Sequence, residues 1–129
     1  MTPALRPLVL LVEDSDDVRE LIAECLSSSG FDVRPARDAF EALRLAKALP
    51  LPDVVLLDLG LPDLDGLEAA RRLQADARTR DIPIVALSAH ALAGSREKAL
   101  AAGCDEFDTK PIEFERLVAT LRRLLADRE

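Results

Sequence analysis

The sequence has few of the residues that build disulfide frameworks and membrane spans. Among its 129 residues are two cysteines, Cys25 and Cys104, whose number and spacing fit neither a disulfide framework nor a metal site. We therefore expect two free thiols packed as small apolar groups. No apolar run approaches the length of a membrane span, and the N-terminus lacks the charged and then apolar pattern of a signal peptide. These absences predict a cytoplasmic protein with no membrane partner.

Positive charge is also scarce. The sequence has 17 lysine and arginine residues against 24 aspartate and glutamate residues, a formal net charge of −7. This acidic excess argues against a general nucleic-acid binder, so we expect no direct contact with nucleic acid. With 49% apolar and 32% charged residues, the composition is that of an ordinary soluble globular protein. The length fits one domain over residues 1–129.

Apolar runs alternate with amphipathic stretches along the whole chain. We expect strands at 8–12, 32–36, 54–57, 82–87 and 107–110. We expect helices from 16 to the stop at Gly30, from the cap at Asp38, and at 67–77, 95–102 and 113–127. Apolar residues at helical spacing, among them Leu21 and Phe40, should face the core.

Strands that alternate with helices predict a parallel sheet with right-handed crossovers and helices on both faces. Five such units predict an α/β fold, a flavodoxin-like doubly wound sheet of five parallel strands in the order 2-1-3-4-5, with five helices. Ligands of such sheets bind beyond the carboxyl ends of the strands, where the strand order reverses. Here that point lies between the first and third strands.

Reactive polar groups follow four of the five predicted strands. Glu13 and Asp14 follow the first strand, and Asp58 follows the third. Ser88 closes the fourth, and Lys110 closes the fifth. Because parallel strands end at the same edge of a sheet, we expect these side chains to meet there.

The predicted cluster has the composition of a phosphoryl-transfer site. Three neighbouring carboxylates repel one another, and a divalent cation relieves that repulsion. Carboxylate oxygens with room for water suit Mg²⁺. Lys110 adds a positive charge and Ser88 a hydroxyl donor, as phosphoryl transfer requires. Asp58 is then the expected nucleophile, forming an aspartyl phosphate.

Each of these residues also has an ordinary role when it is taken alone. Asp14 and Ser88 suit helix caps, Asp58 suits the start of a solvated loop, and Lys110 suits a surface charge. Their order along one fold favours the shared site over four separate coincidences.

Four motifs carry a resemblance to a known family. They are Val12-Glu13-Asp14-Ser15, the segment 57–66 (LDLGLPDLDG), the segment 86–91 (ALSAHA) and the segment 108–112 (DTKPI). With these motifs the chain resembles a receiver domain of the two-component response-regulator family, over a core at about 8–125. Among its members it resembles stand-alone division-control regulators and the receivers of hybrid kinases. We expect a stand-alone receiver or a piece of a larger regulator or hybrid kinase.

The resemblance implies a role for each residue of the cluster. Asp58 accepts a phosphoryl group from the phosphohistidine of a histidine kinase or histidine phosphotransfer protein, with Mg²⁺ as cofactor. Asp14 and Asp58 ligate Mg²⁺ directly, and Glu13 acts mainly through water. The backbone carbonyl of Gly60 completes the protein ligands. Such a chain is a signalling protein rather than an enzyme, although it assists its own phosphorylation and slow dephosphorylation.

The resemblance also implies a conformational switch. Ser88 moves toward the phosphoryl group, and Lys110 pairs with that group. The bond from Lys110 to Pro111 is expected to be cis. Phe107 holds the position of the switch aromatic and should turn inward as Ser88 moves. Because phenylalanine has no hydroxyl, this switch depends on packing.

The expected readout surface is the fourth helix, the fifth strand and the fifth helix, which binds an unknown downstream protein. Arg116, Arg122 and Arg123 belong to that surface, although they also fit a plain solvated helix face. We expect a monomer or a weak dimer. His90, the only histidine, lies two residues beyond Ser88 and fits an exposed loop better than a catalytic role.

Two other classes of protein fit the sequence less well. A hydrolase with an aspartyl-phosphate intermediate usually has a second aspartate two residues after the nucleophile, where this chain has Gly60. A flavin or nucleotide-binding module has a glycine-rich loop after the first strand. The acidic segment 13–17 stands there instead and would repel a phosphate without a metal.

Overall fold

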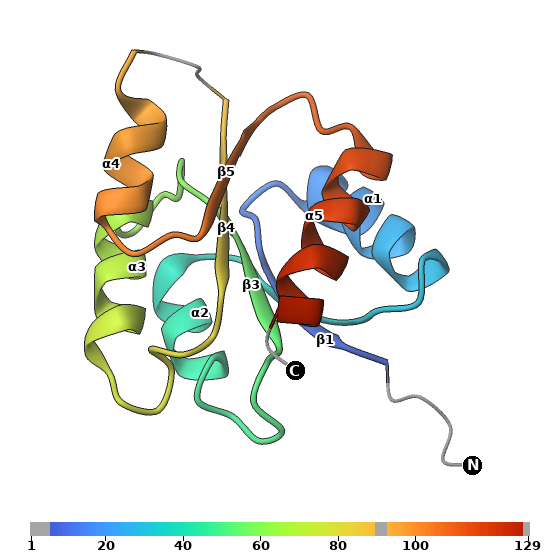
Figure 1. Ribbon diagram of the computed structural model, residues 1–129, viewed down its shortest axis with the longest axis horizontal. Helices are drawn as coiled ribbons and strands as arrows, with labels where there is room; N and C mark the ends of the chain where they lie inside the picture. Colours follow the sequence, from blue (N-terminus) through green and yellow to red (C-terminus); the bar gives the residue numbers. More distant parts are fainter. Residues whose placement is uncertain (1–5, 90–92, 128–129) are drawn as a thin grey trace.

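Five short strands form one parallel sheet in the computed structural model of the chain, which describes residues 6–89 and 93–127 (Figure 1). The strands are β1 (Leu8–Val12), β2 (Asp32–Ala36), β3 (Val54–Asp58), β4 (Ile84–Ser88) and β5 (Glu106–Thr109). Their order is β2-β1-β3-β4-β5, and every neighbouring pair is parallel. The predicted class and strand order are therefore confirmed.

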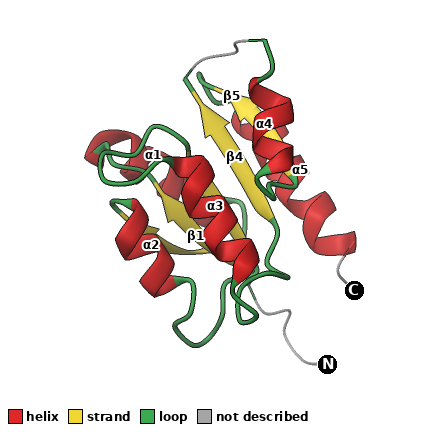
Figure 2. Cartoon of the chain, turned by 90° about the vertical axis from the view of Figure 1, so that its left-hand side faces the viewer, coloured by secondary structure: helices red, strands yellow, loops and turns green. Residues whose placement is uncertain are grey.

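In the described residues, each strand is followed by a helix, and the five helices cover both faces of the sheet. They are α1 (Asp16–Ser28), α2 (Ala39–Leu45), α3 (Gly66–Ala75), α4 (Ser95–Ala101) and α5 (Phe114–Asp127). Helices α1 and α5 lie on one face, and α2, α3 and α4 lie on the other (Figures 1 and 2). No helix in the described part of the chain is long and apolar enough to cross a membrane.

The core has two halves, one on each face of the sheet. Leu10 and Leu57 point toward α2, α3 and α4, while Leu11 and Leu56 point toward α1 and α5. All five residues of β3 are buried. Both faces of the central strands are covered, so their sequences are continuous apolar runs rather than alternating ones.

Some boundaries differ from the predicted ones by a few residues. β4 begins at Ile84 rather than Ile82, because Ile82 donates its N–H to Thr79 in a turn and Pro83 has no N–H to give to a ladder. α3 ends at Ala75, two residues early, because Asp76 adopts an extended conformation.

Two apolar side chains predicted to face the core are exposed instead. Leu21 is 56% exposed and Phe40 is 53% exposed. The buried side of α1 is centred on Ile22, and that of α2 on Ala39 and Ala42, so each exposed residue lies at or beyond the edge of its stripe. The Phe40 ring contacts the guanidinium of Arg72 on α3, 5.9 Å from the ring centre.

The two cysteines are free thiols, as predicted. Cys104 packs within the core, and burial raises the pKa of its thiol to about 11. Cys25 is half-buried, and burial raises its pKa as well.

Candidate metal centre

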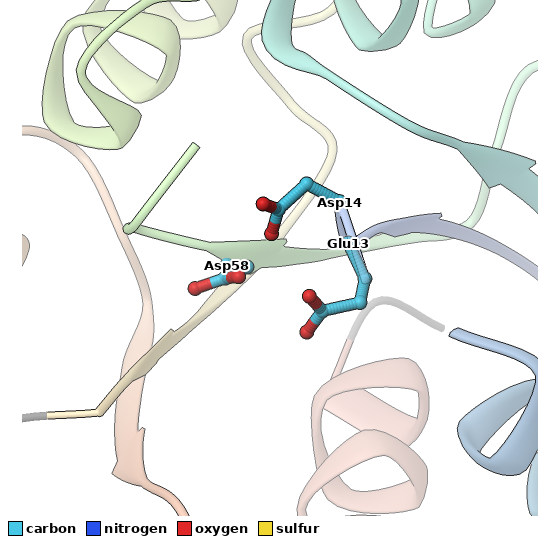
Figure 3. A group of neighbouring side chains, drawn as sticks. All are labelled: Glu13, Asp14 and Asp58. Atoms are coloured by element: carbon cyan, nitrogen blue, oxygen red, sulfur yellow. The ribbon is translucent and has the colours of Figure 1, made fainter. Parts of the chain in front are cut away.

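Three carboxylates meet at the carboxyl ends of β1 and β3. Glu13 and Asp14 directly follow β1, and Asp58 is the last residue of β3. Val12 pairs with Leu57 in the sheet, which places the next residues of the two strands side by side. Each of the three side chains offers an oxygen within 4.8 Å of the others. Figure 3 shows the three side chains together at the ends of the two strands. The strand ends thus bring together the acidic residues that the sequence predicted.

Burial divides these carboxylates into two kinds. Glu13 is 2% exposed and Asp58 is 5% exposed, whereas Asp14 is exposed. A buried carboxylate is costly unless it is paired or coordinates a metal. The cluster is therefore enclosed at its base and open to solvent at Asp14.

Lys110 lies between the two buried carboxylates. Its Nζ donates to Glu13 Oε1 at 2.8 Å and to Asp58 Oδ2 at 3.2 Å. Its backbone N–H donates to the carbonyl of Ser88 at 2.9 Å, which ties the end of β5 to the end of β4. The bond from Lys110 to Pro111 is cis, as predicted.

The pKa shifts of this pair have opposing causes. Burial raises the pKa of Glu13, and the nearby charge of Asp58 adds to that effect, although hydrogen bonds from Lys110 and Ser15 act against it. Burial lowers the pKa of Lys110, but the Glu13 hydrogen bond and the Asp58 charge outweigh it, and the net shift is upward. One cation against three carboxylates leaves a negative excess, which a divalent cation would neutralise. The donor set of carboxylates beside solvent fits Mg²⁺.

Arg19 of α1 contacts the metal centre, and the sequence did not predict this. Its Nη1 donates to the backbone carbonyl of Glu13 at 2.9 Å, and its Nη2 pairs with Asp16. It thereby holds the backbone that carries Glu13 and Asp14. A bond to a main-chain carbonyl has no motif, so no signal in the sequence could have identified it.

The remaining predicted residues lie around the same edge. The Gly60 N–H donates to Asp58 Oδ1 at 3.0 Å, and Gly60 is exposed. A Cβ at Gly60 would lie 3.7 Å from that oxygen, so a larger residue fits there but would cover Asp58. Ser88, the last residue of β4, is half-buried, one residue beyond the partner of Asp58 in the sheet. His90 lies outside the described residues.

Phe107 lies farther from the carboxylates, on β5. It is half-buried, packs against the core on the side of α2, α3 and α4, and lines a cavity of about 130 Å³ between β5 and α5. Arg116 lines the same cavity and forms a two-pronged pair with Asp108, at 2.9 and 3.1 Å.

The sequence matches the response regulator receiver domain family over residues 9–122. The chain belongs to that family. Relatives of this receiver domain include the polar-differentiation response regulators DivK of Brucella anthropi and Brucella ovis. Each is 34% identical over 119 residues, which cover 92% of this chain and 96% of the relative.

Solved receiver domains have the same fold. One is the receiver domain of the sensor histidine kinase PA1611 from Pseudomonas aeruginosa, with a magnesium ion coordinated in its active-site cleft. The two structures superimpose with a TM-score of 0.86 and 36% sequence identity. The matched region covers 94% of this chain and 98% of the PA1611 receiver chain. The receiver domain of the Francisella response regulator 1452 has a TM-score of 0.88 and 27% identity, over 96% and 100% of the two chains. This chain is therefore a receiver domain of phosphorylation-based two-component signalling, a signalling protein rather than a classical enzyme.

Proposed function

We propose that Asp58 accepts a phosphoryl group from the phosphohistidine of a histidine kinase or histidine phosphotransfer protein, with Mg²⁺ bound beside it. One observation carries the proposal. Asp58 is a buried carboxylate at the open edge of the sheet that accepts a hydrogen bond from Lys110 and clusters with the carboxylates of Glu13 and Asp14. A carboxylate in this position can act as the nucleophile, with a cation and metal-ligating groups beside it.

The chain's own residues supply most of the chemistry. An oxygen of Asp58 forms a bond to phosphorus while the bond from phosphorus to the donor imidazole nitrogen breaks, which leaves an aspartyl phosphate. The Gly60 N–H and Lys110 Nζ orient the two oxygens of Asp58. Lys110 then lies within reach of the new phosphoryl oxygens. Mg²⁺, when bound, neutralises the carboxylates and the charge on the phosphoryl group.

The hydrogen bonds of Glu13 support a division of labour among the metal residues. Both of its carboxylate oxygens already accept, one from Lys110 and one from the N–H of Ser15 at 3.1 Å. Glu13 therefore acts on Mg²⁺ mainly through water. Asp14, Asp58 and the backbone carbonyl of Gly60 are the proposed direct ligands.

Gly60 also makes this chain a switch rather than a turnover catalyst. It offers no acid two residues after the nucleophile, so we expect the chain to assist its own phosphorylation and only slow dephosphorylation. The switch itself runs through Ser88, which moves toward the phosphoryl group, and Phe107, which follows into the vacated space. The hydrogen bond from the Lys110 N–H to the Ser88 carbonyl supports this coupling, because it joins the ends of β5 and β4, which must move together.

The proposed readout is the surface of α4, β5 and α5, where a downstream protein binds. Arg116 pairs with Asp108 there, and Arg123 with Glu106 at 2.7 Å, so a shift of β5 changes the charges that this surface presents. We place the switch in the cytoplasm, as a monomer or weak dimer without direct nucleic-acid contact. The net charge of −7 supports the last point.

Replacement of Asp58 tests the acceptor. Wild type, Asp58→Asn and the control Asp65→Asn are incubated with Mg²⁺ and a small-molecule phosphodonor, and the intact proteins are weighed. Asp65 is an exposed carboxylate of the same loop that caps α3, so its loss leaves the acceptor intact. The wild type and the control should gain one phosphoryl group, and Asp58→Asn none. Equal mass gain in all three would refute the proposal.

A beryllium fluoride mimic tests the switch. When it is added with Mg²⁺ to isotope-labelled protein, NMR shifts should change at Ser88, Phe107 and along α4 and α5. The same addition to Asp58→Asn should change none of them. Changes confined to the three carboxylate residues would show a bound ligand without a switch.

A further inference from the structure

The loop from 59 to 65, between β3 and α3, is closed at both ends. The Leu59 N–H donates to the carbonyl of Leu87 on β4 at 2.9 Å. At the other end, Gly66 packs directly on Leu59, since a Cβ added there would lie 2.5 Å from the Leu59 Cα. The loop therefore leaves the sheet and returns to its own starting point. Gly60, whose carbonyl is a proposed Mg²⁺ ligand, lies within it.

Asp63 attaches the far side of this loop to another helix. Its Oδ1 accepts the N–H of Ala39 at 2.9 Å, and its Oδ2 accepts the N–H of Phe40 at 3.0 Å. These are the first two N–H groups of α2, which have no partner within that helix. Asp38 caps the same helix separately, by accepting from Glu41 at 2.8 Å. Asp63 is thus a second acidic cap, supplied by a different part of the chain.

The charge state of Asp63 suits this contact. Burial alone would raise its pKa, but the hydrogen bonds from the N–H groups of Phe40 and Ala39 outweigh burial and lower it. The carboxylate therefore stays ionised at neutral pH. An ionised acceptor forms stronger hydrogen bonds to backbone N–H groups than a neutral one.

We propose that Asp63 is a positioning residue for the metal centre. Its clamp on α2 holds the loop so that the carbonyl of Gly60 is already oriented toward the metal ligands. Glycine is the residue with the most backbone freedom, and ordering it on metal binding would cost affinity. This inference rests on the proposed function, in particular on Gly60 as a ligand.

Thermodynamic reciprocity gives the inference a second consequence. If the Asp63 clamp favours Mg²⁺ binding, bound Mg²⁺ must favour the clamp by the same factor. The N–H groups of Ala39 and Phe40 should therefore exchange with solvent more slowly when Mg²⁺ is present. A carboxylate that merely stabilised α2 would slow these two amides no more than Mg²⁺ slows amides that exchange through global unfolding.

The experiment measures the Mg²⁺ dissociation constant of four proteins by calorimetric titration with magnesium chloride. They are the wild type, Asp63→Ala, Asp63→Asn and the control Asp38→Ala, which removes the other carboxylate from the same helix end. Asp63→Ala should bind about 5-fold more weakly, less than the roughly 10-fold or more that is lost when a group bonded directly to a ligand is removed. Asp63→Asn keeps an acceptor oxygen and should lie between. Asp38→Ala should bind like the wild type.

Each other outcome would overturn the inference. Unchanged affinity in Asp63→Ala, or equal weakening in Asp38→Ala, would leave Asp63 only a role in helix stability. If the amide exchange rates of Ala39 and Phe40 in the wild type do not change when Mg²⁺ is added, that result would contradict the inference independently. A wild type that binds no Mg²⁺ would refute the proposed function itself, which distinguishes the two failures.

Discussion

Lys110 carries the positive charge that lies between the buried carboxylates of Glu13 and Asp58. Removal of a partner from a buried charge pair usually costs more than the pair itself contributes, because a charge is left buried without compensation. The hydrogen bonds and charges of the two acids raise the pKa of Lys110, so its ammonium persists at neutral pH. At the residue scale, this side chain therefore determines how stable the two buried carboxylates are in the folded protein.

We predict that Lys110→Met destabilises the protein by about 2–3 kcal/mol at neutral pH without Mg²⁺. This loss is smaller than the one measured when a fully buried ion pair is broken, because this site opens to solvent. The loss should be smaller at about pH 5 than at about pH 7. Lys110 lowers the pKa of Glu13, so its removal leaves that already raised pKa higher still. A raised carboxyl pKa contributes stability at low pH that disappears as the pH rises through the raised value, since the unfolded chain ionises first.

Urea unfolding at the two pH values measures this loss. Lys47→Met is the matched control, because Lys47 forms an exposed ion pair with Asp76 at 3.5 Å. Such pairs contribute about 0–1 kcal/mol, so this control should stay close to the wild type. A loss in Lys110→Met that grows toward low pH would contradict the prediction.

At the scale of elements, α2 depends on contacts at both of its ends. A helix of seven residues is too short to be stable alone. Asp38 and Asp63 accept from its first N–H groups. At its other end, Arg34 of β2 donates to the carbonyls of Leu45 at 2.9 Å, Ala48 at 3.1 Å and Pro50 at 2.9 Å. The helix and the turn after it are therefore held by side chains of other elements.

We predict that Arg34→Met destabilises the protein by about 2 kcal/mol, because hydrogen bonds to a charged group contribute more than neutral ones and the contacts to three carbonyls are lost. Arg34→Lys should recover only part of this, since an ammonium lacks the planar fork that reaches several acceptors. Urea unfolding gives the values. Arg37→Met, which removes one exposed ion pair with Glu41 at 3.5 Å, serves as control. Equal effects of Arg34→Met and Arg37→Met would rule out this role.

At the scale of the whole molecule, the sheet brings charged residues that lie far apart in the sequence together at one edge. Glu13, Asp58 and Lys110 come from three strands and meet at one edge. The negative excess there opposes folding, so a cation that bound the folded site would stabilise the fold.

We predict that Mg²⁺ raises the melting temperature of the wild type. At about 100 times its dissociation constant, a ligand that binds only the folded state stabilises it by about 2.7 kcal/mol. Asp14→Asn should show a much smaller rise, because it removes an exposed proposed ligand and leaves the buried pair of Glu13 and Lys110 in place. Thermal unfolding monitored by circular dichroism measures both. Sodium chloride at the same ionic strength controls for screening, and an equal rise with that salt would argue against a specific site.

The sequence by itself determined the fold and the membership of the acidic cluster. Continuous apolar runs such as 54–57 mark strands covered on both faces, and a parallel sheet must bring the residues that end its strands to one edge. Glu13, Asp58 and Lys110 could therefore be placed together without coordinates. Spacing at 3.6 residues per turn identified the helices, but it could not place Leu21 and Phe40, which lie at the margins of their stripes.

Only the tertiary structure decided what holds the site in place. Arg19 on the carbonyl of Glu13, Arg34 on the end of α2 and Asp63 on its beginning are all contacts from a side chain to a distant main-chain group. Every residue has the same N–H and C=O, apart from the missing N–H of proline, so such a partner leaves no trace in the sequence. The chemistry of the edge could be predicted because it depends on side-chain identity and strand direction. Its support could not, because it depends on which main-chain groups the fold brings within reach of a distant side chain.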